Sequence, residues 1–234
     1  MNILLLMMGG SGTRFGADRP KQYTMLDGKP IFAYILEAYQ RLEDIDRTVI
    51  VTNGAWVDFV EEWVDKMPRK EIISITVGGT SRSESVLNGL KTASAFAEEN
   101  DNVLIHDATH PYVDVEGTRE IIAALGEYGG ATLGACQYDT CYQMDENRVI
   151  EKVIPRQLLV SGASPEAFHF GDIYRIYSTS TQEQLDTMTS AGAIALANGI
   201  TMKVIPANVL NLKITYPGDM ALFEKLCHTY FFPD

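Results

Sequence analysis

The residues of this chain best suited to chemistry are cations that stand beside glycine-rich loops. Arg14 and Lys21 follow the stretch GGSGT at residues 9–13, which comes directly after the apolar run ILLLMM. Glycines behind a strand let backbone N–H groups approach a phosphate closely, and a forked guanidinium with a point-charge ammonium suits a polyphosphate. When the α-phosphate of a nucleotide is attacked, negative charge builds on its oxygens, and pre-placed cations stabilise that state most. The segment therefore indicates a triphosphate site.

Two known glycine motifs compete for this loop. Gly10, Gly12 and Gly16 have the spacing G-x-G-x-x-x-G, whereas a dinucleotide-binding fingerprint needs G-x-G-x-x-G and an acidic residue further on. A P-loop needs G-K-[ST], which does not occur here. The spacing and the cations disfavour a nicotinamide dehydrogenase. A tight turn at a strand exit explains the glycines alone, but not the cations.

A second loop, VGGTSRSESVLNGL at residues 77–90, also places glycines after an apolar run. Ser81 or Ser83 is a candidate cap for the helix that follows. The same polar side chains and free backbone groups are equally suited to reading the edge of a base. Both interpretations stay open at this stage.

Two further segments carry charged side chains. Asp107 in VLIHDATHPYV follows a predicted strand, where open α/β sheets place their ligands, and it is suited to a metal or to the hydroxyls of a polyol. His106 and His110 flank it without a helix to put them on one face, so a zinc site is disfavoured. Lys213 lies in NLKIT, a strand-like run, where a lysine is usually solvated unless the strand borders a pocket.

Alternating short apolar runs and helical patterns must position these residues. The predicted strands are Ile3–Met8, Thr48–Thr52, Ile72–Val77, Val103–His106, Ala131–Ala135 and Thr201–Ile205. The predicted helices are Ile31–Arg41, Ala55–Lys66, Ser83–Glu99 and Val115–Tyr128. Several strands are apolar throughout, which is typical of strands covered on both faces. We therefore expect an α/β fold with a mostly parallel twisted sheet and helices on both faces.

The alternation breaks after about Tyr138. The stretch YDTCYQMDENRVIEKVIPRQLLV alternates polar and apolar residues around a D-E-N turn signal, which predicts a β-hairpin. This hairpin, at about residues 137–160, either packs across its own domain or reaches a partner subunit. No repeat or linker divides the chain, so residues 1–234 are expected to form a single domain with a protruding β-arm.

Composition limits the class of protein. Of the 234 residues, 46% are hydrophobic and 21% are charged, and the net charge is −12. This charge argues against binding to nucleic acid or to an anionic membrane, and it requires the few cations to be focused at one site. The cysteines Cys136, Cys141 and Cys227 are odd in number and outside C-x-x-C spacing, so we expect small buried thiols. No apolar run has the length of a membrane span or the basic flank of a signal peptide, and a cytoplasmic location is expected.

Taken together, five segments resemble one family. GGSGTRFGADRPKQY, GGTSRSESVLNGL, HDATHP, SPEAF and NLKITYPGD, in this order and across nearly the whole chain, resemble the 2-C-methyl-D-erythritol 4-phosphate cytidylyltransferases and the related enzymes that make CDP-ribitol from ribitol 5-phosphate. The resemblance implies that CTP is joined to a phosphorylated polyol with release of pyrophosphate. It also implies a Rossmann-like nucleotide-diphospho-sugar transferase fold and a homodimer interlocked by the β-arm.

The resemblance further implies roles for individual residues. Arg14, Lys21 and Lys213 would be catalytic, and a Mg²⁺ would bridge the phosphates of CTP in the region of Asp107. The positions implied to bind the nucleotide are Gly9, Gly10, Ser11, Gly12, Thr13, Gly79, Thr80, Arg82, Ser85 and Asp107. Those implied to bind the acceptor are Asp107, His110 and Lys213, with Thr140 and Arg156 reaching in from the neighbouring subunit.

The chain departs from the family pattern on the acceptor side. The family's H-D-A-A-R-P has become HDATHP, so that His110 replaces an arginine, and its T-P-Q-x-F has become SPEAF, with Glu166 in place of glutamine. The family's Thr-Asp-acidic motif falls on Thr189-Ser190-Ala191. We expect retained CTP chemistry with a phosphorylated polyol as acceptor, either 2-C-methyl-D-erythritol 4-phosphate or a ribitol 5-phosphate-like compound, and these departures leave the choice between them open. The alternatives are a transferase using another NTP or a sugar 1-phosphate, and a non-catalytic nucleotide-binding regulator.

Overall fold

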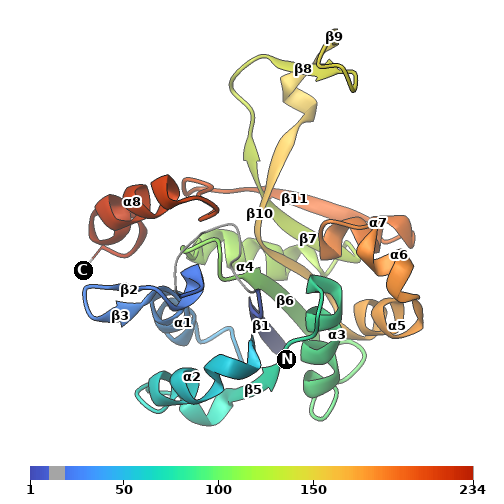
Figure 1. The fold of residues 1–234 in the computed structure, drawn as a ribbon. Coiled ribbons are helices and arrows are strands. Elements are labelled where there is room, and N and C mark those ends of the chain that lie inside the picture. Colours follow the sequence, from blue (N-terminus) through green and yellow to red (C-terminus); the bar gives the residue numbers. More distant parts are fainter. Residues whose placement is uncertain (11–18, 234) are drawn as a thin grey trace.

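A twisted sheet of seven strands forms the centre of the fold in the computed structural model, which describes residues 1–10 and 19–233 (Figure 1). The strand order is β11-β7-β10-β6-β1-β4-β5. The strands are β1 (Asn2–Met8), β4 (Arg47–Thr52), β5 (Ile73–Val77), β6 (Asn102–Asp107), β7 (Gly130–Cys136), β10 (Val160–His169) and β11 (Met202–Pro206). β10 runs antiparallel to β6 and β7, and the other pairs are parallel. The predicted α/β fold with a mostly parallel sheet is confirmed.

Within the seven-stranded sheet, the unpredicted strand is β10, which lies between β6 and β7. Its sequence contains Gly162 and Pro165, residues that are depleted in central strands. Its pairing with β7 shifts register between Gly162 and Glu166, so these residues sit where the regular ladder is interrupted. The irregularity accommodates the proline, but it also interrupts the alternation of polar and apolar residues by which a strand is predicted.

Helices cover both faces of the sheet because β1 is apolar on both sides. Its even-numbered side chains, Leu4, Leu6 and Met8, belong to one apolar cluster with helices on that face, and Ile3, Leu5 and Met7 belong to a second cluster. The helices are α1 (Ile31–Gln40), α2 (Val57–Val64), α3 (Arg82–Ala93), α4 (Val115–Ala124), α5 (Phe170–Thr179), α6 (Gln182–Asp186), α7 (Ala191–Ala197) and α8 (Pro217–Leu226). α1, α2 and α4 contribute to the first cluster, and α3, α5 and α7 contribute to the second. None of the described helices is long and apolar enough to cross a membrane.

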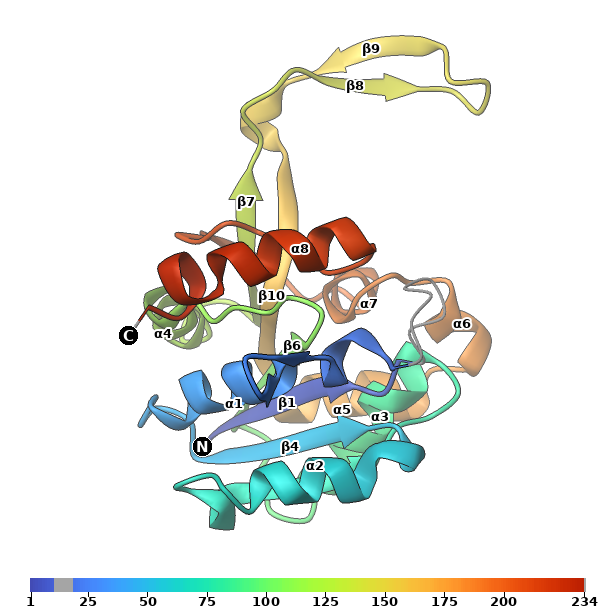
Figure 2. The ribbon, with the colours of Figure 1, turned by 60° about the vertical axis from the view of Figure 1, so that its left-hand side comes forward.

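The predicted hairpin is present as an arm that projects from the body (Figure 2). One end of β7 and one end of β10 extend beyond the sheet. Past these ends, β8 (Cys141–Met144) and β9 (Ile150–Ile154) form a separate antiparallel pair that lies crosswise to them. We call residues 137–160 the arm. Several of its large apolar side chains are exposed: Tyr138, Tyr142, Met144, Val149, Ile150, Val153, Leu158 and Val160. Apolar side chains on so thin an element have no core of their own to enter.

The expectation of buried thiols is wrong for two of the three cysteines. Cys227 is buried at the C-terminal end of α8, but Cys136, the last residue of β7, is exposed, and Cys141 at the start of β8 is half-buried. Both stand on or beside the arm, where a side chain meets little neighbouring structure. All three thiols are free.

Candidate active site

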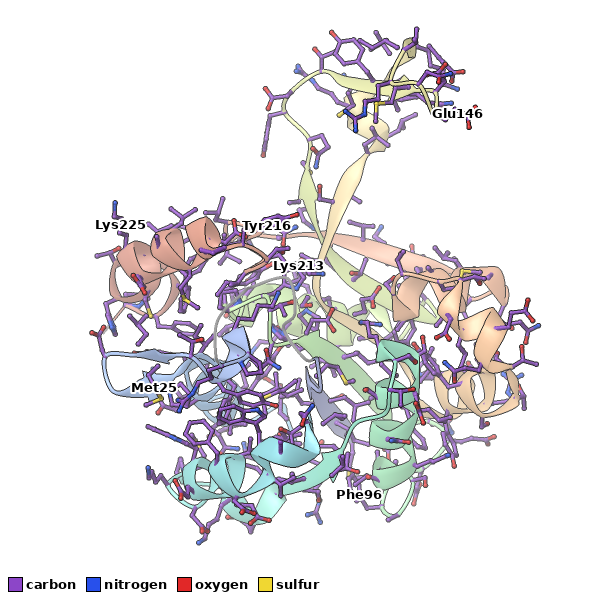
Figure 3. All side chains as sticks on the ribbon, viewed as in Figure 1. Met25, Phe96, Glu146, Lys213, Tyr216 and Lys225 are labelled. Atoms are coloured by element: carbon purple, nitrogen blue, oxygen red, sulfur yellow. The ribbon has the colours of Figure 1, made fainter. Side chains whose placement is uncertain are left out.

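Two lysines from opposite ends of the chain meet above the sheet. Lys21 opens a short 3₁₀ turn, Lys21–Tyr23, and its Nζ donates a hydrogen bond to the carbonyl of Ile214. Lys213 is the residue before Ile214, and it lies near the base of the arm (Figure 3). Both lysines act electrostatically on His110, and Lys213 also acts on Asp107. The structure therefore places Lys21, Lys213, Asp107 and His110 in one region, and the roles assigned to them stay predictions.

The position of Lys213 corrects one detail. Residues 210–215 form neither strand nor helix, so Lys213 does not lie in a strand. The loop is instead fastened at several points: Ile214 N–H donates to Thr109 O at 2.8 Å, Tyr112 Oη donates to Asn211 Oδ1 at 2.8 Å, and Asn211 Nδ2 donates to Gly162 O at 3.1 Å. These bonds fix the backbone around Lys213 while its side chain stays exposed.

The turn that carries Lys21 is anchored by Tyr23, a residue that the sequence did not single out. Its buried hydroxyl donates to Met8 O at 2.9 Å and accepts from Thr52 Oγ1 at 2.7 Å and from Asn53 N at 3.2 Å. Its ring stacks on Trp56 with the ring centroids 4.6 Å apart. One side chain therefore ties the lysine-bearing turn to the ends of β1 and β4.

We predict that Tyr23→Phe destabilises the protein and also lowers activity. The substitution leaves the Thr52 hydroxyl and the Asn53 N–H without this buried partner, which should cost about 1–3 kcal/mol. Urea denaturation measures the loss. Tyr138→Phe is the matched control, since Tyr138 is 84% exposed. An unchanged urea midpoint in Tyr23→Phe would contradict the anchoring role.

The second glycine loop is shaped by its own serines. Ser81 caps α3, because its Oγ accepts from Glu84 N at 3.1 Å, so the first of the two capping candidates is the correct one. The buried Ser85 donates from Oγ to Ser81 O at 2.8 Å and accepts from Gly79 N at 3.0 Å. A Cβ on Gly78 would lie only 2.8 Å from Ser85 Oγ, which explains that glycine. The nucleotide-binding roles expected of Gly79, Thr80 and Ser85 thus fall on a preformed loop.

Asp107 is held by Arg82 at the end of β6. Arg82 Nη2 lies 3.0 Å from Asp107 Oδ1 and 4.0 Å from Glu166 Oε2. Burial raises the pKa of Asp107, but the charges of Arg82 and Lys213 lower it more, and the net pKa is below its ordinary value. Asp107 is therefore ionised at neutral pH and is available as a carboxylate ligand. From the sequence, Glu166 was noted only because it replaces a glutamine of the family motif.

His110 is buried rather than open to a substrate. Its Nδ1 lies 3.1 Å from Ser164 Oγ, which also accepts from Asp107 N at 3.3 Å. Since that oxygen accepts from a backbone N–H, the Ser164 hydroxyl is free to donate to His110. His106 Nε2 bonds His110 O at 2.9 Å, and His106 Nδ1 bonds Tyr39 Oη at 2.9 Å. The two histidines thus belong to a buried hydrogen-bonded network next to Asp107.

Both histidines are neutral at pH 7. Burial is the main cause that lowers the pKa of His106 to about 4 and that of His110 to about 3, with nearby cations lowering the latter further. In the unfolded chain the pKa of each is near 6.5. A depressed pKa in the folded state means that protons bind preferentially to the unfolded chain, so stability is full above pH 6.5 and falls below it.

We therefore expect the free energy of unfolding to fall as the pH drops from about 6.5 towards 4, by up to about 1.4 kcal/mol per pH unit for each histidine. His110→Asn keeps an acceptor near the position of Nδ1 but removes one titrating group, so it should flatten this dependence. Urea midpoints at several pH values measure it, with His228→Asn, a change at an exposed histidine, as the control. Equal slopes for wild type and His110→Asn would contradict the assignment.

The remaining predicted residues follow β1, lie on the arm, or fall outside the part of the chain that the structure describes. Arg14, Ser11, Gly12 and Thr13 fall outside the described residues, whereas Gly9 and Gly10 lie directly behind β1. Thr140 and Arg156 are exposed on the arm, where the Arg156 guanidinium donates to Tyr138 O. Because the arm projects from the body (Figure 2), it does not carry these residues to the site of its own chain. Within residues 1–10 and 19–233, no group of three His, Cys, Asp or Glu side chains could hold a metal by itself.

Comparisons with known proteins cover almost the whole chain. The family profile described as "IspD: 2-C-methyl-D-erythritol 4-phosphate cytidylyltransferase" matches residues 2–228. A 2-C-methyl-D-erythritol 4-phosphate cytidylyltransferase from Thermosipho melanesiensis is 31% identical over 229 residues, with 97% of this chain and 98% of the relative covered. A ribitol-5-phosphate cytidylyltransferase from Vibrio parahaemolyticus is 27% identical over 230 residues, with 98% and 97% covered.

A solved structure supports the same fold. The 4-diphosphocytidyl-2C-methyl-D-erythritol synthase of Anaerococcus prevotii superposes with a TM-score of 0.80 at 21% identity, covering 97% of this chain and 98% of that one. At this level of identity the likeness concerns the fold. The family match, by contrast, extends through every segment that carries the site.

Proposed function

Because this chain belongs to the 2-C-methyl-D-erythritol 4-phosphate cytidylyltransferase family, we propose that it joins the CMP unit of CTP to a phosphorylated polyol and releases pyrophosphate. The family makes it a nucleotidyltransferase. The observation that carries the proposal is the meeting of Lys21, Lys213 and the ionised Asp107 above the ends of β1 and β6. A chain with a net charge of −12 has focused cations where two polyanions must react.

The reaction needs no protein nucleophile. A phosphate oxygen of the acceptor attacks the α-phosphorus of CTP, a new P–O bond forms, and the bond to the leaving pyrophosphate breaks. Lys21, with Arg14, neutralises the charge that builds on the oxygens around that phosphorus. Lys213, on a loop fixed by its backbone bonds, holds the acceptor phosphate in line. Positioning and electrostatics supply the rate.

The donor set around Asp107 fits a Mg²⁺ that is held mainly by the phosphates of CTP. Mg²⁺ commonly takes one or two carboxylates together with substrate phosphates and water, rather than a cage of protein ligands. Asp107 is an ionised carboxylate at a strand end, and the described residues offer no larger cluster. The ion, when bound, neutralises the triphosphate and favours departure of pyrophosphate. Asp107 is the residue that would hold it.

The base is read by the second glycine loop in this proposal. Thr80 is fixed by its N–H and Oγ1, which both donate to Glu84 Oε2 at 2.7 Å, and Ser85 fixes the backbone at Gly79. A rigid loop presents the same carbonyl and N–H groups to each nucleotide, which favours selection of one base. We assign that base as cytosine from the family.

The acceptor is a phosphorylated polyol, and the names of the relatives give 2-C-methyl-D-erythritol 4-phosphate and ribitol 5-phosphate as its two forms. A buried, neutral His110 adds no charge to this side of the site. We infer that Lys213 shares the acceptor phosphate with Thr140 and Arg156 from the arm of a partner subunit in a homodimer. The exposed apolar side chains of the arm support this role.

Three free thiols support a reducing, cytoplasmic setting.

An acceptor panel tests the proposal. The protein is incubated with CTP and Mg²⁺ against 2-C-methyl-D-erythritol 4-phosphate, ribitol 5-phosphate and glycerol phosphates, and the products are identified by mass spectrometry. We expect a CDP-polyol and an equal amount of pyrophosphate from one of the first two. Repeating the assay with ATP, GTP and UTP tests the choice of base. Binding of CTP without pyrophosphate release from any acceptor would favour a non-catalytic regulator instead.

A further inference from the structure

The side chain of Glu166 is a half-buried carboxylate that the proposed reaction does not use. It lies on β10 next to β6, and its exposed fraction is 14%. A charge at this depth is costly unless it is paired and hydrogen-bonded. The partners of Glu166 therefore show what it is for.

The amide groups at the start of α7 hold both oxygens of Glu166. Ala191 N donates to Oε2 at 3.1 Å, and Gly192 N donates to Oε1 at 2.9 Å. Since both oxygens accept, this arrangement suits a carboxylate; a carboxamide would turn its NH₂ group towards one of the two donors. A Cβ on Gly192 would lie 2.5 Å from Oε1, so the close approach also requires a glycine there.

One oxygen of this carboxylate, Oε2, also lies near Arg82. Oε2 lies 4.0 Å from Arg82 Nη2, and the same Nη2 lies 3.0 Å from Asp107 Oδ1. Arg82 Nε is buried and has no hydrogen-bond partner among the described residues, whereas Nη2 contacts Asp107. The guanidinium thus lies between two carboxylates on adjacent strands, and the phenol of Tyr177 is a further neighbour.

We propose that Glu166 is a positioning residue, which acts through Arg82 to hold the Asp107 carboxylate in the orientation that receives Mg²⁺ and the CTP phosphates. This inference rests on the proposed function. The line of contact runs from the backbone of α7 through Glu166 and Arg82 to Asp107. Losing such a support around a metal-binding carboxylate typically weakens metal binding or activity about 10- to 100-fold.

Calorimetric binding of Mg·CTP in the absence of any acceptor tests this relay. Glu166→Gln should weaken Mg·CTP binding about 10-fold. Gly192→Ala should weaken it in the same direction, because its methyl group displaces the carboxylate without altering Arg82. Glu120→Gln is the matched control: it makes the same change at an exposed carboxylate on α4, which packs on the other face of the sheet from α3, so its affinity should stay within about 2-fold of wild type.

A double-mutant cycle separates positioning from general loss of structure. In an Arg82→Gln background, Glu166→Gln should weaken Mg·CTP binding by less than about 2-fold, because the residue through which it acts is gone. Equal losses in both backgrounds, or wild-type affinity in Glu166→Gln, would overturn the inference alone. Failure of the wild-type protein to bind Mg·CTP would overturn the proposed function and this inference with it.

Discussion

Lys21→Ala should lower kcat about 1,000-fold, the size of effect seen when a preorganised charge that stabilises a transition state is removed. Lys21 Nζ reaches the carbonyl of Ile214, beside Lys213, so it lies against the loop that is to hold the acceptor. Charge at the α-phosphorus grows during the attack. The loss should therefore appear in kcat more than in the KM for CTP.

The fold should survive this substitution. The loop at residues 210–215 keeps its bonds from Ile214 N to Thr109 O and from Asn211 Nδ2 to Gly162 O, and the turn at residues 21–23 keeps the anchor at Tyr23. Steady-state kinetics and a thermal melt separate the two effects. Lys29→Ala, which removes a lysine paired with Glu37 at the surface, is the matched control and should leave kcat unchanged. Near-wild-type turnover in Lys21→Ala would refute its catalytic role.

Much of the site could be predicted because its determinants are local. Apolar runs that end in glycines indicate strands whose carboxyl ends carry loops, and parallel strands bring those ends to one edge. Asp107 at the end of β6 and Ser81 at the start of α3 were found in this way. The hairpin followed from its alternation and its D-E-N turn.

What the sequence could not indicate depends on contacts between distant elements. β10 was hidden by Gly162 and Pro165, so nothing suggested that Glu166 would lie beside Arg82. The charge state of His110 follows from its burial against Ser164 and the nearby lysines, which no local pattern encodes.

Two departures from the family pattern prove to be linked in space. Ser190 caps α7 by accepting a hydrogen bond from Ala193 N. Glu166 accepts hydrogen bonds from the N–H groups of Ala191 and Gly192 at the same end of the helix. The carboxylate of Glu166 and the hydroxyl of Ser190 thus meet at one end of α7, and the same carboxylate lies 4.0 Å from Arg82.

Mixing two inactive variants should restore activity if the arm works in the partner subunit. Arg156→Ala removes the arm's cation, and Lys21→Ala disables the site on the body. In a mixed dimer, the subunit with Arg156→Ala keeps its own Lys21 and receives an intact arm from the other subunit. One of the two sites is then complete. Random assortment of equal amounts makes half of the dimers mixed, so about a quarter of the wild-type sites should be regained.

The same mixture distinguishes an arm that acts in the partner subunit from an arm that acts in its own subunit. If the arm folded back onto its own site, each subunit would lack either Lys21 or Arg156 and no combination would be complete, so the mixture would be no more active than its components. Co-expression allows the subunits to assort, and release of pyrophosphate from CTP and the acceptor measures the gain. The control combines both substitutions in one chain and mixes it with an equal amount of wild type. Its mixed dimers contain no complete site if the arm acts in the partner, so only the wild-type homodimers, about a quarter of all dimers, stay active, whereas an arm acting in its own subunit would leave about half of the sites active. The extension of β7 and β10 away from the body, and the exposure of Tyr138 and Leu158 on the arm, favour the regained activity.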